Sequence, residues 1–137
     1  MASNNMFGPI DIAISGMQAQ NKSMSAIFSN VANSRTTDNG NGEPYRRLEA
    51  IFKTMDMEDG ELGGVMVEEL AADMSDFQQI RNLGHPNADA QGYVSMPNVS
   101  LPTEMINLTI ATRAYQANVA ILRRYQQIVE NALELLR

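Results

Sequence analysis

The sequence predicts an α+β fold in which two long terminal helices pack as an antiparallel, coiled-coil-like pair, with a small antiparallel β insert between them. Two observations carry this prediction: an apolar residue recurs every three or four positions at both ends of the 137-residue chain, and the middle lacks this repeat. Such spacing places one residue per turn on a single seam, as in helices that pack lengthwise. We expect a helical segment in residues 1–34, a β-rich insert in 35–98 and a second helical segment in 99–137.

Each terminal segment carries a seam that is expected to pack against another helix. The N-terminal seam consists of Ile10, Ile14, Met17, Asn21, Met24, Phe28 and Val31. The C-terminal seam consists of Leu101, Met105, Leu108, Thr112, Tyr115, Val119, Leu122, Gln126, Val129, Leu133 and Leu136. The polar members Asn21 and Gln126 either fix the register of the pair from a buried position or face solvent or a channel.

A second apolar row lies beside the C-terminal seam, and we expect neighbouring subunits to cover it. It consists of Ile110, Ala114, Ala117, Ile121, Ile128, Ala132 and Leu135. One partner helix covers one seam, whereas a helix that is apolar over a wider arc is buried on several sides. The alternative is a helical hairpin whose second row folds back on the β insert.

The first helix has readable ends. Gly8-Pro9 places a proline in the first turn, where its missing N–H costs nothing, and Asp11 lies near the positive end of the helix dipole. Two Asn-Gly pairs in residues 39–42 favour turns, so the helix is expected to end near Asn33.

Three or four short strands are expected in the insert. Residues 45–53 give a weak strand signal, 65–70 are a second candidate after Gly63-Gly64, 77–83 are a third, and 92–96 are a short last one. Pro97 ends the last of these strands, and Pro102 with Glu104 then opens the second helix. That helix continues for about 34 residues, or roughly 50 Å, which is longer than a small domain is wide.

The chain is acidic, with a net charge of −6, and residues 35–98 hold five basic against twelve acidic residues. Without a stripe of lysine or arginine it lacks the electrostatic footprint of a nucleic-acid or anionic-lipid binder. It has no cysteine and no continuous apolar run long enough to span a membrane. The first residues lack the basic segment of a secretory signal, so no cleaved signal peptide is expected.

Candidate chemical sites are weak, and we expect neither a catalytic residue nor a metal or cofactor. His85 is the single histidine and is better explained as a turn residue, since no nucleophile accompanies it. The acidic turn 56–61 lacks the ligand spacing of a calcium loop. The ten methionines are scattered, and several lie in the seams as adaptable packing residues.

Four segments, in register over nearly the whole chain, resemble the bacterial flagellar rod and hook family and its basal-body rod proteins. They are Ser29–Asn33, Pro44–Arg47, the run Gly84–Val99 with Glu104-Met105, and Arg113–Val119. The residues that carry the resemblance include Asn30, Asn33, Gly84, His85, Pro86, Asp89, Gly92, Tyr93, Met96, Pro97, Asn98, Arg113, Tyr115 and Asn118.

The resemblance implies a structural subunit of the proximal rod, the drive shaft that transmits torque from the motor to the hook and surrounds the export channel. It further implies export through the flagellar type III apparatus without a cleaved signal, and a position in the periplasmic part of the basal body. The expected partners are copies of the chain and other rod proteins, with the paired helices inside the tube and the β insert outside.

Two other classes of protein stay open at this point. A self-contained coiled-coil adaptor or export chaperone would share the helical seams but would form a discrete soluble oligomer. A small enzyme would need convergent polar groups in a pocket, and the sequence shows no such constellation.

Overall fold

A computed structural model describes residues 8–56 and 62–136 of the chain. The elements are α1 (Gly8–Ala32), β1 (Leu48–Asp56), β2 (Leu62–Ala72), β3 (Gln78–Arg81), β4 (Tyr93–Met96) and α2 (Leu101–Leu135). The predicted α+β class and the two long terminal helices are confirmed. The side chains of the acidic turn 56–61, considered above as a calcium loop, lie outside the described residues.

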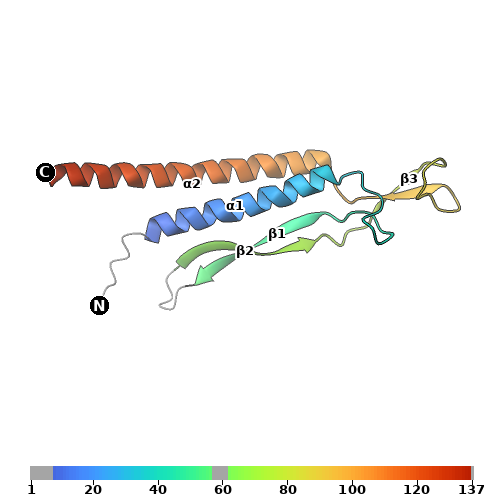
Figure 1. The fold of residues 1–137 in the computed structure, drawn as a ribbon, viewed down its shortest axis with the longest axis horizontal. Helices are drawn as coiled ribbons and strands as arrows, with labels where there is room; N and C mark the ends of the chain where they lie inside the picture. The colour runs from blue at the N-terminus through green and yellow to red at the C-terminus, as the bar shows by residue number, and fades with distance from the viewer. Residues whose placement is uncertain (1–7, 57–61, 137) are drawn as a thin grey trace.

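The molecule is elongated and layered, with α1 in the middle (Figure 1). α2 lies along one side of α1 in the opposite direction, and the β1–β2 hairpin lies along another side. Packing between helix and strand in the described part of the chain is made by α1 and not by α2. The short β3–β4 sheet extends from the end where α1 finishes and α2 begins.

α1 ends where polar side chains compete for its last carbonyl groups. The side-chain amide of Asn33 donates to the carbonyl of Ser29 over 2.9 Å, and the Asn33 carboxamide oxygen accepts from the Thr36 hydroxyl over 3.2 Å. These bonds turn the chain out of the helix within one residue of the predicted end.

β1 pairs antiparallel with β2, and Leu48 is aligned with Ala72 at one end of the ladder. The strand begins three residues later than predicted because the preceding backbone groups bond elsewhere. The Tyr45 N–H donates to the Thr36 carbonyl over 3.0 Å, and the Arg47 N–H donates to the Asn98 side chain over 2.9 Å.

The hairpin is joined to α1 through Ser15. Its hydroxyl donates to the Ile12 carbonyl over 2.7 Å and accepts the Val65 N–H over 3.1 Å. Gly64 has a φ of +121°, and a Cβ on it would collide with the Ser15 side chain. Glycine is therefore required both by the backbone conformation and by the close approach of the helix.

The strands form two separate two-stranded sheets, β1–β2 and β3–β4, where the sequence suggested one insert. The antiparallel pairing is as predicted. β3 is exposed along all four residues, whereas Val94 of β4 is buried, so this sheet is anchored through β4.

The face of α1 that is buried within the chain differs from the predicted seam. The buried residues are Ala13, Ser15, Gly16, Ala19, Ala26, Ile27 and Asn30. Phe28 of the seam is 56% exposed, and Ile10, Ile14, Met17, Met24 and Val31 are half-buried. Because α1 is covered by α2 on one side and by the hairpin on another, small side chains let both neighbours approach its axis.

α2 is less buried than α1. Only Glu104 and Ala111 are fully buried in it, while Leu108, Val119 and Leu122 of the predicted seam are half-buried. Large apolar side chains on both predicted rows stay open to solvent, among them Met105, Ile110, Ile121, Ile128, Val129, Leu133, Leu135 and Leu136. Much of the apolar surface of this helix, which is about 50 Å long, is therefore left uncovered by the rest of the described chain.

Candidate functional site

The described residues hold no group of three or more histidine, cysteine, aspartate or glutamate side chains that could bind a metal. His85 is a turn residue, as the sequence suggested: its Nδ1 accepts the Asn87 N–H over 3.1 Å. Neither helix of the described chain combines the length and the apolarity that crossing a membrane would require.

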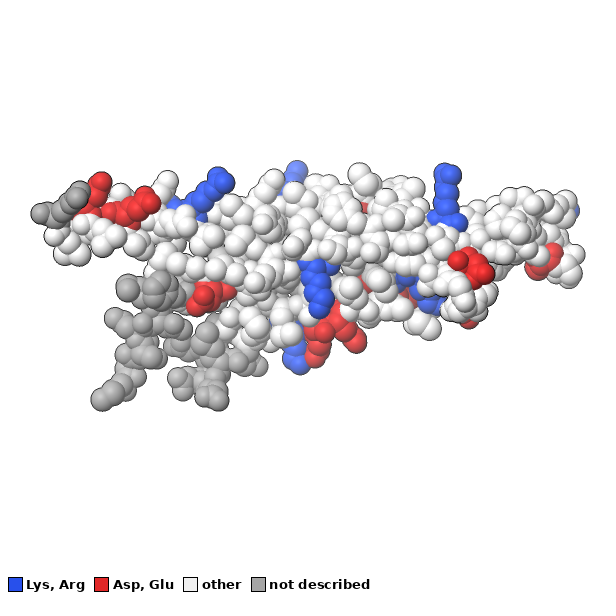
Figure 2. Space-filling view, viewed as in Figure 1, with Lys and Arg blue, Asp and Glu red and all other residues white. Residues whose placement is uncertain are grey.

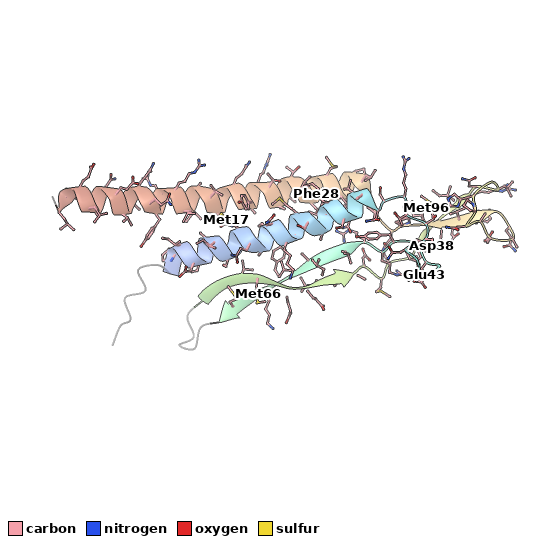
Figure 3. All side chains as sticks on the ribbon, in the orientation of Figure 1. Met17, Phe28, Asp38, Glu43, Met66 and Met96 are labelled. Carbon is pink, nitrogen blue, oxygen red and sulfur yellow. The ribbon has the colours of Figure 1, made fainter. Side chains whose placement is uncertain are left out.

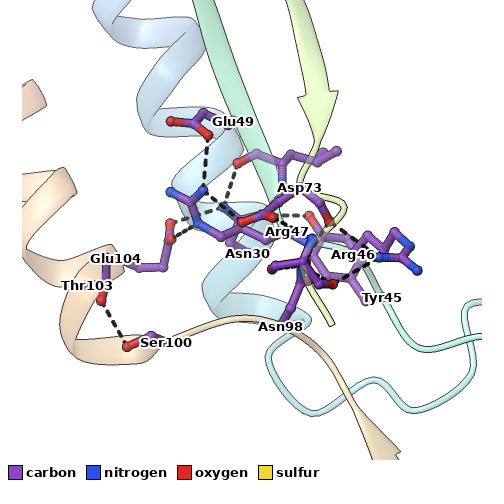
Figure 4. A network of polar contacts seen from close by, with 12 residues as sticks. Asn30, Tyr45, Arg46, Arg47, Glu49, Asp73, Asn98, Ser100, Thr103 and Glu104 are labelled. Carbon is purple, nitrogen blue, oxygen red and sulfur yellow. Dashed lines mark hydrogen bonds and ion pairs between the residues drawn. The ribbon is translucent and has the colours of Figure 1, made fainter. Parts of the chain in front are cut away.

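A network of polar contacts lies at the end where α1 finishes and α2 begins, with Asn30, Tyr45 and Glu104 buried in it (Figure 4). We call it the polar hub and define it by Asn30, Tyr45, Arg47, Asn98 and Glu104. These residues come from the end of α1, the entry to β1, the segment after β4 and the first turn of α2. Segments that are far apart in the sequence are thus tied at one point.

Asn30 is the centre of the hub and is fully buried. Its amide nitrogen donates to the Leu48 carbonyl over 2.9 Å and to the Glu104 carboxylate over 3.0 Å. Its oxygen accepts the Leu48 N–H over 2.8 Å and the Tyr45 hydroxyl over 3.0 Å. An asparagine side chain has two donor hydrogens and two acceptor lone pairs, so all four are used. Toward Leu48 it acts as a strand would, bonding both the N–H and the carbonyl.

Glu104 and Arg47 form the charged pair of the hub. Arg47 Nε donates to Glu104 Oε1 over 2.6 Å, and the Glu104 side chain is 0% exposed. The second carboxylate oxygen accepts from Asn30, so each oxygen of the buried carboxylate has a partner. Among the described residues no buried side-chain nitrogen or oxygen lacks a hydrogen bond. Complete pairing is the condition under which a buried charge can persist.

Asn98 ties the hub to the segment that leaves β2. Its oxygen accepts the Arg47 N–H, and its nitrogen donates to the Asp73 carbonyl and to the Ser75 hydroxyl, each over 2.9 Å. The Arg46 guanidinium lies 4.1 Å from the centre of the Phe77 ring and extends the same contact outward. The start of β1 and the end of β2 are thereby held beside the start of α2.

Ionisation is shifted at two residues of the hub, Tyr45 and Arg47, and at the neighbouring Asp73. Burial first, and then the negative charge of Glu104, raise the pKa of the Tyr45 hydroxyl above its usual value. Burial would lower the pKa of Arg47, but the hydrogen bond and charge of Glu104 outweigh it and raise that pKa. Hydrogen bonds from the Ser75 N–H and hydroxyl, and then Arg47, hold the pKa of Asp73 below its usual value.

The first part of the run Gly84–Val99 forms the loop between β3 and β4. Asp89 Oδ1 accepts the N–H groups of Gln91 and Tyr93 over 2.9 and 2.8 Å. Gly92 adopts a φ of +82°, and a Cβ there would collide with Leu83. Gly84, His85 and Pro86 belong to the same loop, whereas Met96 ends β4 and is followed by the buried Pro97. This part of the motif builds a turn and does not contribute to the hub.

The motif Arg113–Val119 contributes one contact between the two helices. Asn118 of α2 lies against Gly16 of α1, and a Cβ on Gly16 would be 2.6 Å from the Asn118 amide nitrogen. Arg113 is exposed and Tyr115 is 36% exposed. Of the three, only Asn118 is therefore explained by packing within the described chain.

Two apolar flanks lie on opposite sides of the helix pair. Ala111 faces α1 and is buried, whereas Ile110 lines a groove of about 220 Å³ with Phe52 of β1 and residues of α1. Thr112 is directed to the other side, where its hydroxyl is 3.8 Å from the Met24 sulfur. Successive residues of a helix are turned by about 100°, so Ile110 and Thr112 lie on opposite sides of Ala111.

We call these surfaces the groove flank and the seam flank. The groove flank comprises Phe52, Ile110, Ile121 and Ile128, which are 44%, 61%, 52% and 56% exposed. The seam flank comprises Met24, Phe28, Met105 and Tyr115, members of the two predicted seams. Positions 110, 121 and 128 recur on one side of a helix, as do 105, 112 and 115 on the other.

Charged side chains are sparse on the face shown in Figure 2, where uncharged surface covers most of the two helices. Charges of both signs gather below the helices, over the β hairpin. One such pair joins Lys53 and Glu68, at 2.6 Å. The uncharged helical surface is the part suited to contacts between proteins.

Sequence reasoning missed the small-residue face of α1 and the pairing of Arg47 with Glu104. The first left a signal, because Ala13, Gly16, Ser23 and Asn30 recur at helical spacing. A search for large apolar residues passes over such a stripe. The second left none, since the two residues are 57 positions apart and each is ordinary for its local element.

Comparisons with known proteins agree with the motifs. Residues 90–135 match the family model described as flagellar basal body rod FlgEFG protein C-terminal. The flagellar basal-body rod protein FlgC of Yersinia enterocolitica is 37% identical over 91% of this chain and 93% of its own length. FlgC of Escherichia coli O6:H1 is 36% identical over 98% of both chains, and FlgC of Aquifex aeolicus is 34% identical over 95% and 96%.

Proposed function

The chain belongs to the FlgC family of flagellar basal-body rod proteins and is a structural component of the rod, not an enzyme, and we propose that it assembles through the two apolar flanks of its helix pair. The groove flank of one subunit would receive the seam flank of the next. The observation that carries this proposal is the presence of two different exposed apolar surfaces on opposite sides of one subunit.

Contacts between unlike surfaces lead to rings or helical arrays, whereas a self-complementary surface closes into a dimer. A tube is a helical array, so the two flanks suit a rod subunit better than a discrete oligomer. The proposal keeps the expectation that the terminal helices line the tube and the β region lies outside. It also assigns the second apolar row to neighbouring subunits, with Ile121 as its central residue.

The finer features of the function belong to the same proposal. The subunit would lie in the proximal rod, in the periplasm, would transmit torque toward the hook and would help to surround the export channel. Its partners would be copies of itself and other rod proteins, and the flagellar type III apparatus would deliver it without removing a signal peptide. The names of the relatives support a place in the rod, and the elongated helix pair, with few charges on the face in Figure 2, suits close lateral packing.

The experiment replaces the native gene with variants and follows export, incorporation into purified basal bodies and swimming. Phe28→Glu and Ile121→Glu each bury a carboxylate in a proposed contact, which costs several kcal/mol without a partner. We expect both variants to be exported but absent from basal bodies. Leu122→Glu, at a half-buried position, should instead disturb the helix pair within the subunit.

Gln127→Glu is the matched control, because it adds the same charge to an exposed position of α2 outside both rows. It should assemble normally. Normal incorporation of both Phe28→Glu and Ile121→Glu would exclude the two-flank arrangement. A purified subunit that forms one fixed soluble oligomer through these residues would favour the adaptor or chaperone alternative.

A further inference from the structure

The loop between the end of α1 and Tyr45 contains both Asn-Gly pairs of the chain, Asn39-Gly40 and Asn41-Gly42. Residues 38–43 are all exposed, so water reaches both asparagine side chains. The loop lies at the end of the molecule that carries β3 and β4, as the labels of Asp38 and Glu43 show (Figure 3). Asn-Gly is the dipeptide most open to spontaneous deamidation, since glycine has no side chain to hinder attack by its nitrogen.

The reaction is an internal cyclisation followed by hydrolysis. The backbone nitrogen of the glycine loses its proton and attacks the side-chain carbonyl carbon of the asparagine. A nitrogen–carbon bond forms, the bond to the side-chain amide breaks and ammonia leaves, giving a succinimide. Water then opens the ring to aspartate or to isoaspartate. The rate depends on whether the glycine nitrogen is free to lose its proton and to approach the carbon.

In this loop one carboxylate holds both attacking nitrogens. Asp38 Oδ1 accepts the Gly40 N–H over 2.8 Å and the Gly42 N–H over 3.0 Å. A hydrogen bond to an ionised acceptor is stronger than a neutral one, and a nearby negative charge opposes loss of the proton from the nitrogen. Each bond must therefore break before its glycine can react.

The two asparagines are not held equally. Asn41 Oδ1 accepts the Glu43 N–H over 3.0 Å, so its side chain must also be released before ring closure. The side chain of Asn39 forms no hydrogen bond with the described residues. We propose that Asp38 protects both Asn-Gly pairs from deamidation, and that Asn39 is the more susceptible of the two.

The protection matters because of what the loop connects. Deamidation at either position adds a negative charge beside Asp38 and Glu43, and isoaspartate adds one atom to the backbone. Asn41 lies four residues before Tyr45, whose hydroxyl donates to Asn30. A change of backbone length here alters the segment that joins the end of α1 to the hub.

The test incubates the full-length protein in neutral buffer and measures aspartate and isoaspartate at each position by peptide mapping with mass spectrometry. Asp38→Ala should accelerate deamidation at both positions by about tenfold, the effect of losing one charge-assisted hydrogen bond. Glu43→Gln removes the same charge from the same loop without touching the glycine bonds, and should keep the wild-type rates. Asp38→Asn retains a neutral acceptor and should give an intermediate rate.

Equal rates in wild type and Asp38→Ala would overturn the proposal. Equal acceleration by Asp38→Ala and Glu43→Gln would also overturn it, by assigning the effect to loop charge. In the wild type, faster reaction at Asn41 than at Asn39 would overturn the proposed order. Circular dichroism of each variant distinguishes a local effect from loss of the fold, and Asp38→Asn provides the comparison if the alanine variant is unfolded.

Discussion

Gly16 of α1 and Asn118 of α2 lie so close together that a Cβ on Gly16 would be 2.6 Å from the Asn118 amide nitrogen. Gly16 is buried within a face of small residues. The contact therefore sets how closely the helices approach at a point well removed from the polar hub. Glycine has two effects at this position: it has a low intrinsic helix propensity, and it leaves space for Asn118. Substitutions at the two positions can measure these effects separately.

The first prediction is that Gly16→Ala stabilises the protein in an Asn118→Ala background but not in the native background. Alanine is favoured over glycine in a helix by about 1 kcal/mol. In the Asn118→Ala background that gain should appear as a higher free energy of unfolding. In the native background the new methyl group meets the Asn118 amide, and the gain should be lost. Urea denaturation of the four proteins measures the coupling, and identical effects in both backgrounds would rule out the steric explanation.

The second prediction concerns Asn30. Asn30→Ala removes four hydrogen bonds and leaves Glu104 Oε2, the Tyr45 hydroxyl and the Leu48 N–H without their Asn30 partner, while Glu104 Oε1 keeps Arg47. Unsatisfied buried groups cost about 1–3 kcal/mol each, so a loss of about 3 kcal/mol is expected for the whole.

Asn33→Ala is the control for Asn30, because Asn33 bonds only within the helix end and its immediate turn. Its loss should be about 1 kcal/mol. Thermal and urea unfolding followed by circular dichroism compare the two. If the two variants were equally stable, Asn30 would not be the centre of the cluster.

The third prediction is that the Arg47–Glu104 pair is costly to break and less costly to replace. Arg47→Met or Glu104→Met alone leaves an uncompensated charge in or near the core and should cost about 3–5 kcal/mol. The double variant removes both charges and should be more stable than at least one single variant. Additive losses in the double-mutant cycle would show that the ionic contact contributes nothing of its own.

The fourth prediction is a loss of stability in alkali caused by Tyr45. Its pKa is raised in the folded state, so the protonated hydroxyl is favoured by folding. This contribution is complete below the unfolded pKa of about 10 and is lost as the pH rises through the folded value. Tyr45→Phe should flatten the fall in unfolding free energy above about pH 10.

Tyr93→Phe is the control for the alkaline prediction, since Tyr93 is 44% exposed and lies outside the hub. An alkaline fall of the same steepness in Tyr45→Phe and wild type would assign the loss to other groups.

The sequence was sufficient to predict elements whose signals are local. Proline in the first turn and an acidic residue nearby define the starts of both helices, and polar residues around Asn33 define the end of α1. The strands were predicted within a few residues because β-branched residues and glycine turns mark them. The late start of β1 was missed because the Arg47 N–H bonds to Asn98, a residue 51 positions away.

The residues that α1 buries most deeply within the chain could not be predicted from apolar periodicity. A repeat of large apolar residues indicates where a helix will meet some partner, but does not indicate which partner is in the same chain. Phe28 satisfies the repeat and is 56% exposed, whereas Gly16 and Asn30 break it and are buried. In α1, residues beside the predicted seam, such as Gly16 and Asn30, therefore pack most deeply within the chain.

The concentration of polar ties at one end has a mechanical consequence. Asn30 and Glu104 fasten the helices where α1 ends, whereas the distant part of α2 beyond Tyr125 carries only exposed side chains. Displacing the fastened end requires breaking buried hydrogen bonds, and bending the far end of α2 does not. We therefore expect the end that holds Asn30 and Glu104 to resist deformation more than the part of α2 beyond Tyr125. One sequence built this way can seat against neighbours of slightly different shape without changing its own fold.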